Sequence, residues 1–276
     1  MHALLTGPLC VETLTLPIAN LPQRLSGLRV VQLSDFHWDG VRLSEELLNQ
    51  AIAATNRANP HLIALTGDFV TTSPEPIYSL ASRLRALESS AGVFAVLGNH
   101  DTRPSRRSTI IRALTEAGIQ VLWNQVAYPF GADFAVVGLA DLWTKEFDPA
   151  PLFRSLPPQV PRLVLAHNPD CAEVLQQWRV DLQLSGHTHG GQIHLPGLGA
   201  PHALYLALRD CIPTELRSWL PYMRRDSDRI VRHWEWVQGL HQVGNNQLYV
   251  NRGLGTYYPG RLFCPPEVTV FTLVLA

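Results

Sequence analysis

Apolar residues in the first two thirds of the chain form short runs that polar segments interrupt. The first run, 11–16, alternates apolar and polar side chains with a period of two, which is typical of a half-buried strand, and Pro17 is expected to end it. The later runs are mostly apolar, and the run at 61–65 is continuous, as in strands buried on both faces of a largely parallel sheet. They predict strands at 28–33, 61–65, 92–97, 121–123, 134–138, 161–166 and 182–185, and closing strands at 247–250 and 268–274.

Helical signals lie between several of these strands. Ser44 is expected to cap a helix that ends near Ala58, because Glu45 and Glu46 then occupy the first turn, where the helix dipole favours carboxylates. Further helices are expected at about 76–88, 105–117 and 172–178. The repeated order of strand, polar segment and helix predicts an α/β layered fold, formed as a single domain over residues 1–276.

This alternation stops between residues 201 and 236, where aromatic and aliphatic side chains are interleaved with arginines. We interpret the segment as an insertion, or cap, within the domain. Rings and arginines of this kind enter the headgroup region of anionic membranes, so peripheral membrane contact is one expectation. Pro213 and Pro221 would break a long amphipathic helix, which favours an ordinary cap packed over the site. Both interpretations remain open at this stage.

Composition narrows the class of protein. Hydrophobic residues make up 46% of the 276 residues and charged residues 16%, as expected for a protein with a large core. The formal net charge of −1 produces no overall field that attracts nucleic acid, so no nucleic-acid partner is expected. Four scattered cysteines and the lack of a secretory or membrane-spanning pattern predict a cytoplasmic protein, in contact at most with the inner face of the membrane. The cysteines are expected to be small buried side chains.

Five of the predicted strands end in segments that carry carboxylate, amide or imidazole groups. The carboxyl ends of parallel strands meet at one edge of a sheet, so these groups are expected to share a crevice. A mixed oxygen and nitrogen set suits Mn²⁺, Fe²⁺ or Zn²⁺ better than Ca²⁺, and it is large enough for two ions that share a carboxylate. The candidate residues are Asp35, His37, Asp68, Asn99, His100, His167, His187 and His189.

The order of these segments resembles the signature of the calcineurin-like metallophosphoesterases, which reads Asp-x-His, Gly-Asp, Gly-Asn-His-Asp/Glu, a separate His and Gly-His-x-His. The corresponding residues here are 35–37, 67–68, 98–101, 167 and 186–189. Segments 251–255 and 263–267 further resemble a bacterial branch of single-domain members related to UDP-diacylglucosamine diphosphatases. The resemblance implies a metallophosphoesterase-like sandwich of two mixed β-sheets flanked by helices.

The resemblance also implies a role for each residue. The metal ligands it implies form two sets, with Asp68 in both: Asp35, His37, Asp68 and His189 for one ion, and Asp68, Asn99, His167 and His187 for the other. A hydroxide shared by the two ions would attack phosphorus in line. His100 would protonate the leaving oxygen or stabilise charge in the transition state, and Asp101 would hold the His100 imidazole in its useful tautomer.

Other residues near these segments have plainer interpretations. Asp39 is expected to belong to a turn and Trp38 to wall the pocket. Arg252 and Arg261 are either phosphate contacts or structural arginines. Four histidines outside the segments are expected to be surface or packing residues: His194, His202, His233 and His241.

The predicted function is that of a metal-dependent phosphohydrolase that cleaves a phosphodiester or pyrophosphate, with a lipid-linked or nucleotide-sugar substrate and Mn²⁺ as the preferred ion. Two alternatives stay open: a cyclic-nucleotide phosphodiesterase, and a catalytically silent scaffold that retains the fold. His100 separates the enzyme from the scaffold, because a scaffold needs no proton donor beside the metal ligands.

Overall fold

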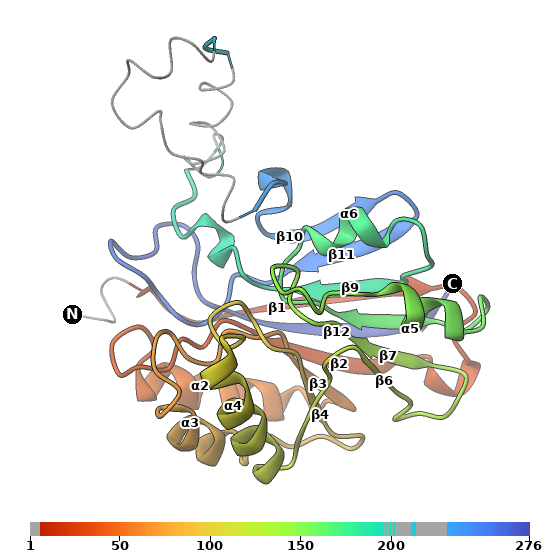
Figure 1. Ribbon diagram of the computed structural model, residues 1–276, viewed down its shortest axis with the longest axis horizontal. Helices are drawn as coiled ribbons and strands as arrows, with labels where there is room; N and C mark the ends of the chain where they lie inside the picture. The colour runs from red at the N-terminus through yellow and green to blue at the C-terminus, as the bar shows by residue number, and fades with distance from the viewer. Residues whose placement is uncertain (1–5, 196, 198, 200, 202–210, 214–230) are drawn as a thin grey trace.

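The computed structural model describes residues 6–195, 197, 199, 201, 211–213 and 231–276. Two six-stranded β-sheets pack face to face, and helices cover their outer faces (Figure 1). This arrangement confirms the predicted sandwich of two mixed sheets. The first sheet has the order β1 (Cys10–Ile18), β12 (Glu267–Leu275), β2 (Leu28–Leu33), β3 (Leu62–Leu65), β4 (Val93–Ala95) and β5 (Ile119–Val121). The second has the order β10 (Gly239–Val243), β11 (Asn246–Val250), β9 (Leu182–Ser185), β8 (Arg162–Leu165), β7 (Ala135–Gly138) and β6 (Gln125–Ala127).

Most neighbouring strands are parallel, so their carboxyl ends lie at one edge of the sandwich. Among the described strands of the two sheets, the antiparallel neighbours are β12 with β2, β10 with β11, and β6 with β7. The helices that flank the first sheet are α2 (Glu45–Arg57), α3 (Ile77–Leu84) and α4 (Pro104–Glu116), and those that flank the second are α5 (Ala150–Ser155) and α6 (Cys171–Leu175). Short 3-10 helices lie at η1 (Gln23–Leu25), η2 (His189–Gly191) and η4 (Trp234–Trp236).

Apolar side chains fill three layers, which explains the mostly apolar runs in the sequence. Val30, Leu62 and Phe271 of the first sheet meet Leu163 and Leu184 of the second in the layer between the sheets. Two further layers lie between each sheet and its helices. Strands buried on both faces cannot alternate apolar and polar residues without burying unpaired polar groups.

The predicted helix start at Ser44 is confirmed. Its hydroxyl accepts a hydrogen bond from the Leu47 N–H at 3.2 Å, and Glu45 and Glu46 occupy the first turn. The Glu45 carboxylate also pairs with Arg83 of α3, at 2.6 Å. The cap therefore fixes the start of α2, and the ion pair ties that helix to α3.

Some local features differ from the expectations. Pro17 lies within β1 and does not end it, because β1 is an edge strand, where a residue without an N–H is tolerated. The sequence pattern does not predict β6 or α5, which are too short to give a clear period. None of the described helices is long and apolar enough to cross a lipid bilayer.

The prediction that all four cysteines are buried is wrong in part. Cys171 and Cys264 are buried, Cys10 is half-buried on the edge strand, and Cys211 is exposed. Cys211 belongs to the 201–236 insertion, away from the three apolar layers. Residues 202–210 and 214–230 of that insertion lie outside the described residues, so neither interpretation of it is tested.

Candidate metal centre

The strand ends bring residues from distant parts of the sequence into one buried cluster. Asp35 and His37 follow β2, Asp68 follows β3, Asn99 follows β4, His167 follows β8, and His187 and His189 follow β9. Three overlapping groups have possible ligand atoms within 4.8 Å of one another: Asp35, His37 and His189; His37, Asp68 and His100; and Asp68, His167 and His187. The predicted ligands therefore meet in one place.

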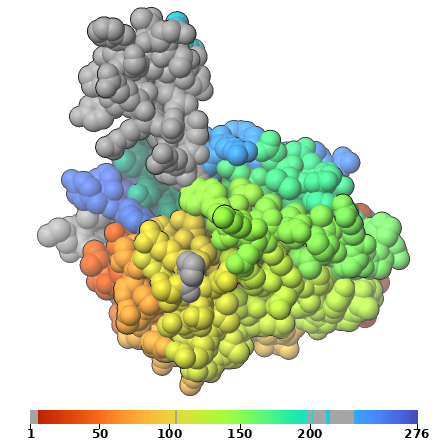
Figure 2. All heavy atoms as spheres, viewed as in Figure 1, coloured from red at the N-terminus to blue at the C-terminus, as the bar shows by residue number. Residues whose placement is uncertain are grey.

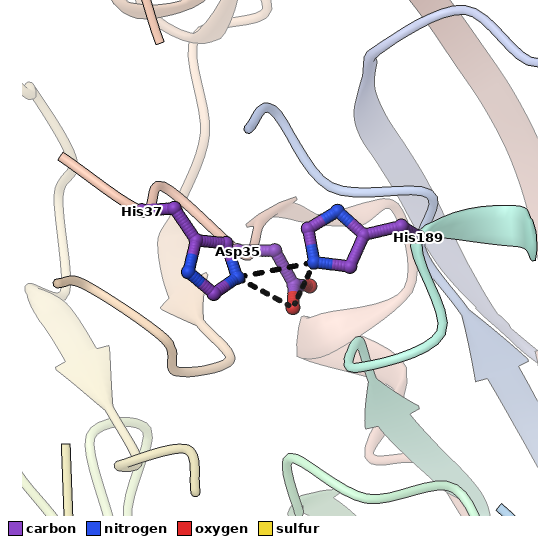
Figure 3. A group of neighbouring side chains, drawn as sticks. All are labelled: Asp35, His37 and His189. Atoms are coloured by element: carbon purple, nitrogen blue, oxygen red, sulfur yellow. Dashed lines mark hydrogen bonds and ion pairs between the residues drawn. The ribbon is translucent and has the colours of Figure 1, made fainter. Parts of the chain in front are cut away.

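The first group contains Asp35, His37 and His189, which point toward one another from the ends of two different strands (Figure 3). The Nε2 atoms of the two histidines are 3.1 Å apart. The Asp35 Oδ1 atom is 4.0 Å from His37 Nε2 and 3.5 Å from His189 Nε2. The three donor atoms thus surround a point where one cation would fit.

The second group is centred on His167. Its Nε2 atom is 3.3 Å from Asp68 Oδ2, 3.1 Å from Asn99 Oδ1 and 3.2 Å from His187 Nδ1. The same Asp68 Oδ2 atom is 3.4 Å from His37 Nε2, in the first group. Asp68 therefore faces both groups, as the resemblance implies for a carboxylate shared by two ions.

The backbone is strained where these donors leave the strands. Five of the candidate ligands have positive φ angles, which are uncommon for residues other than glycine and cost about 1–3 kcal/mol each. These residues are Asp35 (52°), His37 (43°), Asp68 (54°), His187 (74°) and His189 (53°). Strain of this kind clusters at functional sites, where the surrounding fold holds it in place.

Two motif glycines are required by close approach of the chain to the carboxylates. A Cβ atom on Gly98 would lie 2.2 Å from Asp68 Oδ1. A Cβ atom on Gly186 would lie 2.0 Å from Ser34 Oγ and 2.3 Å from Asp35 Oδ2. Any larger residue at either position would displace a carboxylate of the cluster.

Backbone carbonyl groups orient two of the histidines from behind. His167 Nδ1 lies 2.7 Å from the Thr66 oxygen, and His189 Nδ1 lies 3.0 Å from the Gly255 oxygen. A carbonyl oxygen only accepts hydrogen bonds, so Nδ1 of each ring carries the proton. When these rings are neutral, each Nε2 lone pair faces the cluster. Metal-ligating histidines typically donate their other ring N–H to a carbonyl or carboxylate in this way.

The charges in the cluster suit cations. Burial lowers the pKa of His37 to about 3 and that of His189 well below its usual value, so both rings are neutral near pH 7. Burial opposes ionisation of Asp68, but the neighbouring His167 holds the pKa of Asp68 well below its usual value. Burial likewise opposes the charge on His167, yet the Asp68 carboxylate raises the pKa of His167 to about 10. A proton on His167 thus balances Asp68, and binding of a cation there would release it.

His100 lies beside the cluster and is held by a residue that the sequence analysis did not single out. Its backbone N–H donates to Asp68 Oδ1 at 2.9 Å, and its Nδ1 lies 2.8 Å from the Thr71 carbonyl oxygen. The prediction that Asp101 holds this imidazole is wrong. The buried Asp101 carboxylate accepts backbone hydrogen bonds from Phe69, Val70 and Gly98 at 3.0–3.3 Å, because its side chain points into the loops behind the site.

A cleft of about 570 Å³ opens over the cluster. Sequence reasoning did not identify several of its lining residues, namely Trp143, Gln192, Trp234 and Tyr257. Trp143 lies in the segment that follows β7. A search for candidate residues after every predicted strand would therefore have included it. Its side chain is 50% exposed, and its ring centroid is 4.9 Å from that of His187. Figure 2 shows the yellow surface around α4 next to the green surface of later segments. Arg107 of α4 pairs with Glu146 at 2.6 Å.

The two arginines left open by the sequence have structural contacts. Arg252 pairs with Glu12 at 2.8 Å and with the buried Glu267 at 2.7 Å. Arg261 donates hydrogen bonds to the carbonyl groups of Arg252, Gly253 and Gly255 at 2.7–3.1 Å. These contacts support the structural interpretation of both arginines.

The expectation for Asp39 is confirmed, and the expectation that Trp38 walls the pocket is wrong. Asp39 Oδ1 accepts hydrogen bonds from the Val41 and Arg42 N–H groups, both at 2.9 Å, as in a turn. Trp38 does not line the cleft, because its ring is buried in the apolar layer between the first sheet and its helices. Its indole N–H donates to Ser79 Oγ at 2.7 Å.

The histidines outside the motifs are packing residues where the structure describes them. The His233 ring stacks on Trp236 with centroids 3.9 Å apart. His194 and His241 contact the side chain and the backbone of Gln238, respectively. His202 lies outside the described residues.

Comparison with known proteins gives consistent matches. The family described as "Calcineurin-like phosphoesterase" matches residues 28–191. Phosphodiesterase YaeI of Escherichia coli (strain K12) is 37% identical over 89% of this chain and 82% of its own length. The UDP-2,3-diacylglucosamine pyrophosphatase LpxG of Chlamydia muridarum is 27% identical, with coverage of 89% and 83%. The crystal structure of a dimetal phosphatase from Danio rerio has the same fold, with a TM-score of 0.52, 12% identity and coverage of 84% and 90%.

Proposed function

The chain belongs to the calcineurin-like phosphoesterase family and is a metal-dependent phosphohydrolase, and we propose that it hydrolyses a phosphodiester or pyrophosphate bond at the strand-end cluster. The observation that carries this proposal is the position of Asp68 Oδ2, 3.4 Å from His37 Nε2 and 3.3 Å from His167 Nε2. One carboxylate facing two groups of buried donors is the arrangement that two divalent ions require.

The donor set fits two ions of the borderline class. Each group combines carboxylate oxygen with imidazole nitrogen, and the second adds the Asn99 amide oxygen. Asp35, His37 and His189 would hold one ion, Asn99, His167 and His187 the other, and Asp68 both. When bound, two such ions supply an activated water molecule as nucleophile and neutralise charge on the phosphoryl oxygens. We propose Mn²⁺ as the native ion, with Fe²⁺ and Zn²⁺ as alternatives.

His100 is the residue placed to move a proton. Its ring lies at 87° to that of His37, with centroids 5.0 Å apart, and the Thr71 carbonyl holds Nδ1. The Nε2 atom is therefore the one that can reach a substrate in the cleft, and it would protonate the leaving oxygen as the bond to phosphorus breaks. A scaffold would need neither this group nor the strained backbone at five candidate ligands.

Metal-dependent hydrolysis of bis(p-nitrophenyl) phosphate tests the proposal. We expect turnover after addition of Mn²⁺, loss of turnover on chelation, and recovery when Mn²⁺ is restored, because the cluster lacks a nucleophile of its own. The measurement is release of p-nitrophenolate, repeated with Zn²⁺ and Fe²⁺. Full turnover in the chelated protein, or none with any of the three ions, would contradict the proposal.

The cleft provides a place for the part of the substrate that does not react. Its volume of about 570 Å³ lies in the range of small-molecule sites. The similarity to YaeI supports a phosphodiester, and the similarity to LpxG supports the pyrophosphate of a nucleotide-linked lipid. We propose that a flat or apolar substrate group packs on the exposed ring of Trp143. Contact of the 201–236 insertion with an inner membrane surface stays a prediction from the sequence.

Replacement of Trp143 by Ala is expected to raise KM for bis(p-nitrophenyl) phosphate with little change in kcat. A ring contact contributes about 0.5–1.5 kcal/mol, which corresponds to a rise in KM of about threefold to tenfold. Initial rates over a range of substrate concentrations measure both constants. Tyr128→Ala is the matched control, since Tyr128 is similarly exposed and does not line the cleft. An equal effect of both variants, or a change confined to kcat, would contradict the contact.

A further inference from the structure

A short segment after β11 touches the outer side of both histidines in the first group. The Gly255 carbonyl oxygen lies 3.0 Å from His189 Nδ1, and the Tyr257 hydroxyl lies 3.0 Å from His37 Nδ1. The Tyr257 ring meets both imidazoles edge-on, with centroids 4.9 Å from His37 and 5.3 Å from His189. Residues 255–257 therefore form the wall that supports one half of the metal centre.

The two contacts differ in chemistry. The Gly255 carbonyl only accepts, so it fixes the proton of a neutral His189 on Nδ1 and leaves a lone pair on Nε2. A phenol hydroxyl both donates and accepts, so Tyr257 can pair with Nδ1 of His37 in either tautomer.

This difference matters because His37 Nε2 faces His189 Nε2 at 3.1 Å (Figure 3). Two lone pairs at that distance would repel each other, so the contact itself needs the proton of His37 on Nε2, with His189 Nε2 as acceptor. With an ion between them both Nε2 atoms must offer lone pairs, and the proton of His37 must lie on Nδ1. Tyr257 keeps the ring in one orientation in both states.

Tyr257 is itself held firmly. Its backbone N–H donates to Gln192 Oε1 at 2.6 Å, and the Arg42 guanidinium lies over its ring, 4.5 Å from the centroid. The preceding residue, Thr256, donates its N–H to the Arg42 carbonyl oxygen at 2.9 Å. Because these contacts fix the Tyr257 ring, its hydroxyl can hold the His37 imidazole in one orientation.

We infer that Tyr257 is a positioning residue of the metal centre, whose hydroxyl holds the His37 ring so that Nε2 faces the ion bound with Asp35 and His189. The inference rests on the proposed two-ion centre and assigns Tyr257 to one of the two ions. The other ion has its own support, since the Thr66 carbonyl orients His167.

Calorimetric titration of metal-free protein with Zn²⁺ tests the inference, with Tyr257→Phe compared with the unmodified chain. The substitution keeps the ring and removes only the hydroxyl. We expect one of the two binding events to weaken by about 10–100-fold, the usual effect of losing an outer contact of a ligand, and the other to stay unchanged. Tyr258→Phe is the matched control, because the neighbouring Tyr258 is 92% exposed. It should bind both ions as the unmodified chain does.

Nitrogen NMR of ¹⁵N-histidine-labelled, Zn²⁺-loaded protein gives a second readout that does not depend on activity. The Nδ1 proton of His37 should be protected from exchange with water in the unmodified chain and exchange rapidly in Tyr257→Phe. Unchanged binding and unchanged protection in that variant would overturn the inference alone. Failure of the unmodified chain to bind two ions would overturn the proposed centre and the inference with it.

Discussion

Replacement of Asp68 by Asn is expected to abolish hydrolysis and to leave at most one tightly bound ion. The Asp68 Oδ2 atom faces His37 and His167 in the two donor groups, at 3.4 and 3.3 Å. An amide of the same shape keeps the packing but loses the charge that both cations share. Because a bound ion contributes several kcal/mol to transition-state stabilisation, the rate should fall by about a thousandfold or more.

Metal analysis and p-nitrophenolate release, made on the same preparation, measure this result. Asp133→Asn is a suitable control, since that carboxylate is exposed and pairs with the exposed Arg24, and it belongs to none of the three donor groups. Two tightly bound ions in Asp68→Asn, with the rate retained, would show that the carboxylate is not shared.

Replacement of His100 by Ala is expected to lower turnover by about a hundredfold for a substrate with an alkoxide leaving group, because general acids typically contribute about this factor. The backbone N–H of residue 100, which donates to Asp68 Oδ1 at 2.9 Å, remains in the variant. Both ions should therefore stay bound, and the variant separates proton transfer from metal binding.

Comparison of two leaving groups sharpens this prediction. p-Nitrophenolate needs little protonation, so the loss with an aryl ester should be smaller than with an alkyl ester if His100 donates a proton. Measurement of kcat for both esters, with metal content determined in parallel, gives the result. Equal losses would indicate that His100 stabilises charge, and parallel loss of metal would indicate that it is a ligand.

The sequence alone predicts most of the elements that hold the centre. Strands buried on both faces have mostly apolar runs, and the runs at 28–33, 61–65 and 182–185 end where the structure ends β2, β3 and β9. Donor residues directly after such runs must lie at the strand ends, since a strand leaves its next residues at the edge of the sheet. For this reason the eight candidate residues were expected to share one crevice, although Asp35 and His189 are separated by most of the motif region. The choice of seven of them as metal ligands came from the family resemblance.

Which residues contact the candidate ligands and His100 from behind depends on the tertiary structure. Asp101 is adjacent to His100 in sequence, yet its carboxylate binds backbone N–H groups at Phe69 and Gly98, while Thr71 reaches the imidazole. Adjacent residues at a sharp turn point in different directions, so sequence proximity does not predict contact.

Tyr257 and Trp143 depend on the fold in the same way. Tyr257 reaches His37 across 220 positions, and Trp143 reaches the cleft from β7. Local patterns of apolar and polar residues determine which segments become strands and which donors stand at their ends. Which distant side chain supports each donor is decided only when the two sheets pack together, because that packing sets the contacts between residues with no local relation.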